Sequence, residues 1–508
     1  MLLRQFSIDG LGHLSALIAD ESARMAAVVD PRRDVDVYLA AAREADLRIS
    51  HVVETHLHND YVSGGRELAA LTGATHVIGA GAELAYEHRP VRHGDAFGVG
   101  RLQFKVLETP GHTPEHVAYS VADRSRADEP ALLFTGGSLL VGAVGRTDLL
   151  GADNALPFAR AMFRSIGEVI LSHPDYVGVY PTHGAGSLCS TGISSTPNST
   201  IGYERRHNPM VGAADVDTFA RILLSGQPAF PRYFARMRPI NQAGPRLLGG
   251  ALPEARPLGV KEVEAAVAGG ALVVDLRSPA AHATAHIPGS ISIPTGSSFG
   301  TWLGWVVDHD RPLVFVLERP GDWDDAIRQA LRIGHEQVIG TLGGGFTAWS
   351  GSNAPVEAGG RLTVDQLAAR LDPAGSGSGR DAAPLVIDVR QLGEFADGHI
   401  PGSLHLAGGS LPDRLDELPR DRPIATVCAS GYRASVAASL LQAAGFSNVS
   451  WVADGIPSWR RRGHPTETGT SDASDAAGDP GQTGEAAADP HGHHHGAASD
   501  PAAPARSG

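Results

Sequence analysis

The chain has 508 residues, 42% of them hydrophobic, and a formal net charge of −14 at pH 7. This length predicts several folded domains, and the acidic balance without a basic block argues against nucleic acid as a partner. No run of about 18 apolar residues occurs, so we expect no membrane span. The N-terminus lacks an apolar leader with a cleavage site, and the two cysteines stand far apart. Both features indicate a cytoplasmic protein with free thiols.

Residues 1 to about 245 show strand-like apolar runs that alternate with helical patterns, which predicts one α/β domain. We expect strands at 25–29, 49–53, 102–107, 117–121, 131–134 and 177–180, and helices over 35–45 and 66–71. A stretch rich in Pro and Gly, from Asn241 to Pro257, predicts a linker to the next domain.

The candidate metal ligands of this first domain lie on polar turns, each at the end of an apolar run. They are His56, His58, Asp60, His112 and His183. Two histidines at positions i and i+2 on an irregular turn can face one cavity, and α/β folds place their sites at strand ends. Because imidazole is a common ligand of zinc and iron, the pattern predicts a metal site.

An internal repeat follows the linker. An apolar run ending in Asp275 and another ending in Asp388 are each followed, eleven residues after the Asp, by the word HIPGS. The repeat predicts two similar α/β domains, over residues 258–355 and 361–464. The second contains a Gly- and Ser-rich loop insertion at 372–380.

The C-terminal stretch 466–508 has almost no apolar bulk, so we expect a disordered tail. It contains His491 and the run His493–His495, which fit either a metal-capture tract or a solvated low-complexity segment.

In the order of its histidine turns, the chain resembles the metallo-β-lactamase superfamily, and within it the persulfide dioxygenases fused to rhodanese domains. The words that carry the resemblance are HNDYVSGG at 58–65, VGRTDL at 144–149 and PTHGAGSLC at 181–189. The repeat resembles the rhodanese domain. The resemblance implies an αββα metallo-β-lactamase sandwich with a metal at its edge, followed by two rhodanese-like α/β domains.

The resemblance also implies Fe(II) held by two histidines, here His56 and His112, and by an Asp after a Thr-Gly pair. In this chain that Asp position is Gly137, and Tyr61 stands where a further histidine is expected. The metal is then absent, is held by His56, His58 and His112 as zinc or iron, or is completed by Asp60 or Asp148. Replacing Gly137 by Asp is expected to raise the iron content. Cys189 fits either a thiol on the substrate side of this site or a buried structural cysteine.

Cys428 is the candidate nucleophile of the second repeat. It follows the strand-like run 424–427 and opens the loop CASGYR before a helical pattern. Backbone N–H groups and a helix N-terminus favour a thiolate, the reactive form of cysteine. Arg433 adds a cation for an anionic sulfur substrate.

The first repeat lacks these groups. When residues 311–334 are aligned without gaps on 422–445, Leu317 takes the place of Cys428 and Asp322 that of Arg433. We expect this repeat to be catalytically silent and to act as a spacer or docking surface.

Three functions remain open. In the first, the N-terminal domain oxidises a low-molecular-weight persulfide to sulfite and Cys428 transfers sulfur between persulfide, sulfite, thiosulfate and thiol. In the second, only Cys428 is active and the N-terminal domain is a degenerate binding module. In the third, the N-terminal domain is a zinc-dependent thioester hydrolase. We expect a homo-oligomer in each case.

Overall fold

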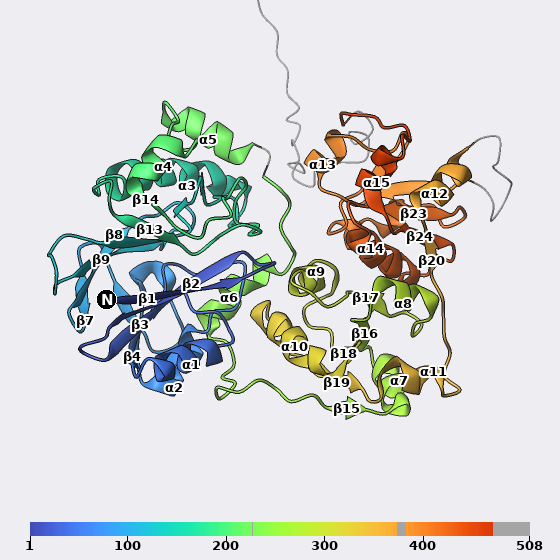
Figure 1. Ribbon diagram of the computed structural model, residues 1–508, viewed down its shortest axis with the longest axis horizontal. Coiled ribbons are helices and arrows are strands. Elements are labelled where there is room, and N and C mark those ends of the chain that lie inside the picture. Colours follow the sequence, from blue (N-terminus) through green and yellow to red (C-terminus); the bar gives the residue numbers. More distant parts are fainter. Residues whose placement is uncertain (226, 373–382, 471–508) are drawn as a thin grey trace, which may run out of the picture.

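The structure is a computed structural model that describes residues 1–225, 227–372 and 383–470. Figure 1 shows the N-terminal domain on one side of the molecule and the two repeats on the other. The expected insertion at 372–380 lies almost entirely outside the described residues, as do His491 and His493–His495 of the tail.

The N-terminal domain contains two six-stranded sheets, with strand orders β1-β2-β3-β4-β5-β6 and β14-β13-β10-β9-β8-β7. The first sheet contains β1 (Leu2–Ile8), β2 (His13–Asp20), β3 (Met25–Val29), β4 (Arg48–Val53), β5 (Thr75–Gly79) and β6 (Arg89–Val91). The second contains β7 (Ala96–Val99), β8 (Leu102–Glu108), β9 (Val117–Asp123), β10 (Leu132–Gly136), β13 (Gly178–Pro181) and β14 (Ser199–Thr200). Apolar side chains of both sheets, among them Ile18, Val53 and Phe104, form one buried cluster, so the sheets pack face to face.

Helices cover the outer face of each sheet. Apolar residues of α1 (Asp36–Glu44) and α2 (Gly65–Thr72) pack on the first sheet. Those of α3 (Ala152–Arg164), α4 (Ile201–His207) and α5 (Val216–Leu224) pack on the second. A short hairpin of β11 (Leu139–Leu140) and β12 (Ala143–Val144) follows β10. The expected αββα sandwich is therefore confirmed.

Each repeat contains a five-stranded parallel sheet, and the two strand orders, β15-β19-β18-β16-β17 and β20-β24-β23-β21-β22, are equivalent. The first repeat contains β15 (Pro257–Leu258), α7 (Val260–Ala268), β16 (Leu272–Asp275), α8 (Pro279–Thr284), β17 (Ile291–Ser292), α9 (Phe299–Val306), β18 (Leu313–Val316), α10 (Trp323–Arg332), β19 (Val338–Leu342) and α11 (Gly345–Ser350). The second contains β20 (Gly360–Leu362), α12 (Val364–Leu371), β21 (Leu385–Asp388), α13 (Leu392–Ala396), β22 (Leu404–His405), β23 (Ile424–Val427), α14 (Tyr432–Ala443), β24 (Val449–Val452) and α15 (Gly455–Arg461).

Helix α9 of the first repeat lies between the N-terminal domain and the second repeat (Figure 1). On one side, Thr301 donates a hydrogen bond of 2.9 Å to the carbonyl of Gly10. On the other, Trp305 lies so close to Gly409 that a Cβ there would be 2.0 Å from its ring. The first repeat therefore contacts both of its neighbours, which supports its expected role as a docking element.

Two stretches differ from expectation. Helix α6 (Phe234–Ala243) extends into the expected linker, and beyond it the backbone N–H groups of Leu248 and Gly250 donate to Glu67. At the other end, Glu467 falls in the expected tail but exchanges two backbone hydrogen bonds of 2.9 Å with His399. Both segments are held by polar backbone contacts, which the composition of a stretch does not reveal.

Candidate functional site

The histidine turn lies at the carboxyl end of β4, beside the end of β3. The ligand atoms of His56, His58 and His183 all lie within 4.8 Å of one another. Those of His112, His183 and Cys189 do so as well. The structure therefore brings the four histidines expected from the sequence into one cluster and adds a thiol to it.

The side chains of this cluster are buried, with exposed fractions of at most 2%, and several of their polar atoms have no hydrogen-bond partner among the described residues. These atoms are Nε2 of His56, Nδ1 of His58, Nε2 of His112, both ring nitrogens of His183 and both carboxylate oxygens of Asp60. A buried polar atom without a partner costs about 1–3 kcal/mol. Because imidazole nitrogens and a carboxylate are metal donors, this set fits a metal ion.

Hydrogen bonds on the far side of the rings of His56, His58 and His112 fix which nitrogen of each remains free. Nδ1 of His112 donates to the carbonyl of Arg146 over 2.8 Å, and Nδ1 of His56 shares a bond of 2.8 Å with the hydroxyl of Thr55. Nε2 of His58 lies 3.0 Å from a carboxylate oxygen of Glu54. Outward bonds of this kind orient metal-binding histidines.

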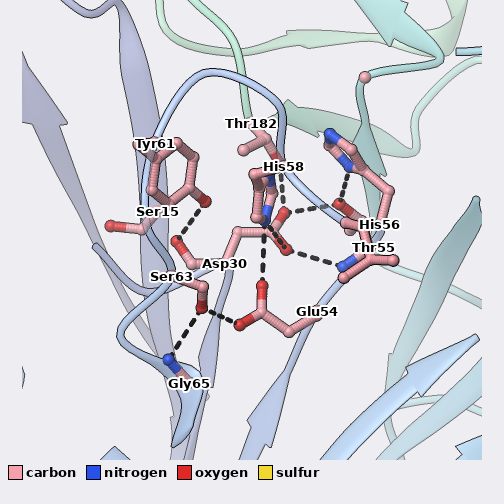
Figure 2. Close-up of polar contacts among 12 residues, drawn as sticks. Ser15, Asp30, Glu54, Thr55, His56, His58, Tyr61, Ser63, Gly65 and Thr182 are labelled. Carbon is pink, nitrogen blue, oxygen red and sulfur yellow. Dashed lines mark hydrogen bonds and ion pairs between the residues drawn. The ribbon is translucent and has the colours of Figure 1, made fainter. Parts of the chain in front are cut away.

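Asp30 is the hub behind the cluster (Figure 2). Its carboxylate accepts hydrogen bonds from the backbone N–H of Thr55 over 2.7 Å, from the Thr55 hydroxyl over 2.8 Å and from the hydroxyl of Thr182. It also lies 3.4 Å from Nε2 of His58. Asp30 has a φ of 48°, in the left-handed region that few non-glycine residues adopt. Strained backbone at such a hub is typical of functional sites.

Burial and neighbouring charges decide the protonation of the cluster. Burial lowers the pKa of His112 to about 3 and that of His56 well below its ordinary value, so both rings stay neutral. Burial opposes charge on His58 too, but the bonds to Asp30 and Glu54 outweigh it and raise its pKa to about 10. Around Asp60, His183 and His58 outweigh the effect of burial and lower the carboxyl pKa. The neutral rings of His56 and His112 beside the ionised carboxylate of Asp60 suit a cation, whereas His58 must release a proton before it can bind one.

At position 137, where the family resemblance places an Asp, the ring of His112 leaves no space for a side chain. A Cβ built on Gly137 would lie 2.2 Å from Cδ2 of His112. The expectation that an Asp at 137 raises the iron content requires room for a side chain there, and the ring of His112 occupies that space. Of the two replacement carboxylates, Asp148 is held by Arg146 at 2.6 and 2.7 Å. The oxygens of Asp60 have no hydrogen-bond partner among the described residues, and one of them lies 3.2 Å from Nδ1 of His183 inside the cluster. Asp60 is the available carboxylate.

Sequence reasoning missed the residues behind the ligands. They are His13, Asp30, Glu54 and His116, all buried. His116 accepts a hydrogen bond of 2.9 Å from the backbone N–H of Gly137, and His13 contacts the carbonyl of Asp30 at 2.9 Å. The one available signal was the acidic residue directly after each of the apolar runs 25–29 and 49–53.

The second candidate site is the loop between β23 and α14. The Sγ atom of Cys428 accepts hydrogen bonds from the backbone N–H groups of Gly431, at 3.1 Å, and Ala434, at 3.4 Å. Gly431 has a φ of 90°, and a Cβ there would lie 2.6 Å from the carbonyl oxygen of Ala453. The loop therefore requires glycine at this position and directs N–H groups toward the sulfur, which favours its thiolate.

Arg433, expected to hold an anionic substrate, instead pairs with Glu394 at 2.6 and 2.7 Å. In the first repeat, Leu317 occupies the position of the nucleophile, and Asp322 binds Arg319 at 2.8 Å. That loop contains neither a thiol nor a cation in the equivalent place.

Comparison with known proteins follows the same division. The family model of the metallo-beta-lactamase superfamily matches residues 9–173, and that of the rhodanese-like domain matches 259–352 and 364–462. Human persulfide dioxygenase ETHE1, mitochondrial, is 30% identical over 231 residues, which span 44% of this chain and 80% of that protein. The chain belongs to the persulfide dioxygenase family of the metallo-β-lactamase superfamily, and carries two rhodanese-like domains.

Two further relatives are informative. The crystal structure of a metallo-beta-lactamase from Staphylococcus aureus is 33% identical, with a TM-score of 0.61, and covers 67% of this chain and 98% of that chain. A hydroxyacylglutathione hydrolase from Polaromonas is 34% identical over 170 residues, 33% of this chain and 60% of the relative. The family and the rhodanese-like domains place the protein in sulfur metabolism. Among the described residues, no helix combines the length and apolar character of a membrane span.

Proposed function

We propose that this persulfide dioxygenase–rhodanese fusion transfers sulfane sulfur at Cys428 and oxidises a low-molecular-weight persulfide to sulfite in its N-terminal domain. The observation that carries the transfer step is the pair of N–H groups directed at Sγ of Cys428. With thiosulfate as donor, the Cys428 thiolate attacks the outer sulfur. A Cys428 persulfide forms, the S–S bond of thiosulfate breaks, and sulfite leaves with the bonding electron pair.

The residues around Cys428 have distinct roles in this step. The N–H groups of Gly431 and Ala434 stabilise negative charge first on the thiolate and then on the persulfide. Arg433 is held beside the loop by Glu394, so we assign it the positioning of α14 and a long-range positive potential rather than direct substrate binding.

In the N-terminal domain, the histidine cluster and Asp60 would hold the metal ion. A bound iron would supply a centre at which dioxygen and persulfide react, and open coordination positions are needed for both. The chain itself contributes the orientation of the ligands. Thr55, Glu54 and the carbonyl of Arg146 hold the rings, and Asp30 holds Thr55 and Thr182 in turn.

Joining the two activities in one chain raises the effective concentration of the sulfur species that passes between them. A specific observation also favours hydrolysis as a second candidate. The ligand nitrogens of His56, His58 and His183 lie within 4.8 Å of one another and form a three-imidazole set, which suits zinc and an activated water once His58 has lost its proton. A hydroxyacylglutathione hydrolase is also among the relatives.

The deciding experiment measures three quantities on one preparation of the full-length protein. These are thiosulfate:thiol sulfur transfer, oxygen uptake with glutathione persulfide, and iron and zinc content. Cys428→Ser should abolish transfer, and Ser430→Ala, an exposed change in the same loop, should retain it. Transfer that survives Cys428→Ser would refute the first half of the proposal. Absence of oxygen uptake in iron-loaded protein would refute the second half, and thioesterase activity with zinc would replace it.

A further inference from the structure

Cys189 has a place in the metal cluster that its sequence position did not reveal. Its Sγ atom lies within 4.8 Å of the ligand nitrogens of His112 and His183, and the residue is fully buried. Three donors at such mutual distances can contact one ion, because zinc–nitrogen and zinc–sulfur bonds are about 2.0–2.3 Å long. The neighbouring Asp60 contributes two further oxygens without a hydrogen-bond partner among the described residues, one of which lies 3.2 Å from Nδ1 of His183.

Arg146 ties the backbone of Cys189 to the ring of His112. Its N–H donates to the carbonyl of Cys189 over 2.8 Å, while its own carbonyl accepts from Nδ1 of His112 over 2.8 Å. The guanidinium of Arg146 also donates to the carbonyl of Leu188 over 3.1 Å. One residue therefore fixes the thiol and the imidazole relative to each other, as expected of two ligands of the same ion.

The site has Asp60 as an anionic group but lacks the second carboxylate of the family pattern. The carboxylate that the family resemblance places at position 137 is absent, and the ring of His112 leaves no room for it. A thiolate at Cys189, which follows His183 shortly in the chain, would supply the negative charge of the missing carboxylate.

We propose that Cys189 is a metal ligand, and that His112, His183 and Cys189 bind one ion beside Asp60. This inference rests on the proposed function only in assuming that the N-terminal domain binds a metal. On binding, the sulfur–hydrogen bond breaks, the proton leaves to solvent and a sulfur–metal bond forms, without oxidation or reduction. Thiolate and imidazole together favour zinc over harder ions, so we expect the isolated protein to retain zinc more tightly than iron.

The test uses full-length, metal-free protein and cadmium or cobalt as the probe. The chain has two cysteines, so Cys428→Ser leaves Cys189 as its one thiol and serves as the matched control. Titration of the unmodified protein and of Cys428→Ser should produce a sulfur-to-metal charge-transfer band that saturates with the ion. Cys189→Ser should lack the band and bind zinc at least ten-fold more weakly.

A band that persists in Cys189→Ser, or zinc binding to the unmodified protein without any band, would overturn the inference, as would a failure to bind any of these ions. If Cys189→Ser does not fold, the cadmium-113 NMR shift of Cys428→Ser decides, because thiolate ligation moves that resonance strongly downfield and imidazole with carboxylate alone does not. Failure of the proposed function is read separately, as sulfur transfer that survives Cys428→Ser.

Discussion

Replacement of Gly137 by Asp tests whether this site can be rebuilt along the family pattern. A Cβ at 137 would lie 2.2 Å from Cδ2 of His112 and 2.8 Å from its Cγ and Nε2, and real Cβ contacts essentially never fall below 3.0 Å. The ring must therefore move by about 0.8 Å or more, the smallest displacement that relieves overpacking of this kind. Any such movement also disturbs the bond of 2.8 Å between Nδ1 of the same ring and the carbonyl of Arg146.

The structure sets the size of the effect. Displacing a well-packed buried ring costs about 1–3 kcal/mol, and the loss of its hydrogen bond to Arg146 costs roughly 0.5–1.5 kcal/mol more. For a domain of this size, a loss of about 2–4 kcal/mol lowers the melting temperature by roughly 5–15 °C. Metal affinity should fall by about 10–100-fold, as when the partner that orients a ligand is lost.

The assay is the metal content per chain after incubation with iron or zinc, together with thermal unfolding of the metal-free protein. Gly167→Ala is the matched control, because a Cβ there has open space around it and the backbone is helical. We expect the control to behave as the unmodified protein. Gly137→Asp that gains iron and keeps its melting temperature would refute the reasoning and restore the family's carboxylate ligand.

Three further predictions concern the rest of the chain. A chain truncated after residue 465 should lose about 1–3 kcal/mol of stability relative to one truncated after residue 470, because it lacks the two backbone bonds of Glu467 to His399; equal denaturant midpoints would contradict this. Burial lowers the pKa of His335 to about 3, below its ordinary value of 6.5, so the unfolded chain binds a proton that the folded chain does not. The stability contributed by this ring is complete above pH 6.5 and is lost as the pH falls toward 3. His335→Leu should therefore reduce the slope of the unfolding free energy against pH in that range by up to about 1.4 kcal/mol per pH unit. An unchanged slope in urea titrations at pH 7, 6 and 5 would count against this. Introducing Leu317→Cys into Cys428→Ser should not restore sulfur transfer. In the same ungapped alignment, Asp322 takes the place of Arg433, and Pro320, which has no backbone N–H, takes the place of Gly431. Measurable turnover would contradict this.

The first repeat, which has no cysteine, contacts both of its neighbours. Its helix α9 contacts Gly10 of the N-terminal domain and Gly409 of the second repeat. Tyr432 of the second repeat lies at the start of α14, beside the Cys428 loop. Its hydroxyl donates a hydrogen bond of 3.3 Å to the carbonyl of Pro294 in the first repeat. The first repeat therefore contacts the helix that follows the Cys428 loop.

Local patterns in the sequence determined much of this protein. The strand at 25–29 was predicted to the residue, since five apolar residues before Asp-Pro leave one reading, and the equal Asp-to-His spacing identified two domains with equivalent sheets. The strand–loop–helix setting of Cys428 was predicted in the same way, because a strand, a Gly-containing loop and a helix start are adjacent along the chain.

The tertiary structure alone decided what the metal cluster contains. Cys189 and Asp30 are far from His112 in sequence. Tertiary packing brings the thiol of Cys189 within 4.8 Å of a ligand nitrogen of His112, and brings Asp30 within hydrogen-bonding distance of Thr55. Whether position 137 accepts a carboxylate depended on where the ring of His112 lies, and whether Arg433 faces a substrate depended on Glu394, which is 39 residues away. A sequence pattern shows which groups are present, but their orientation follows from contacts between distant segments, and metal coordination depends on orientation.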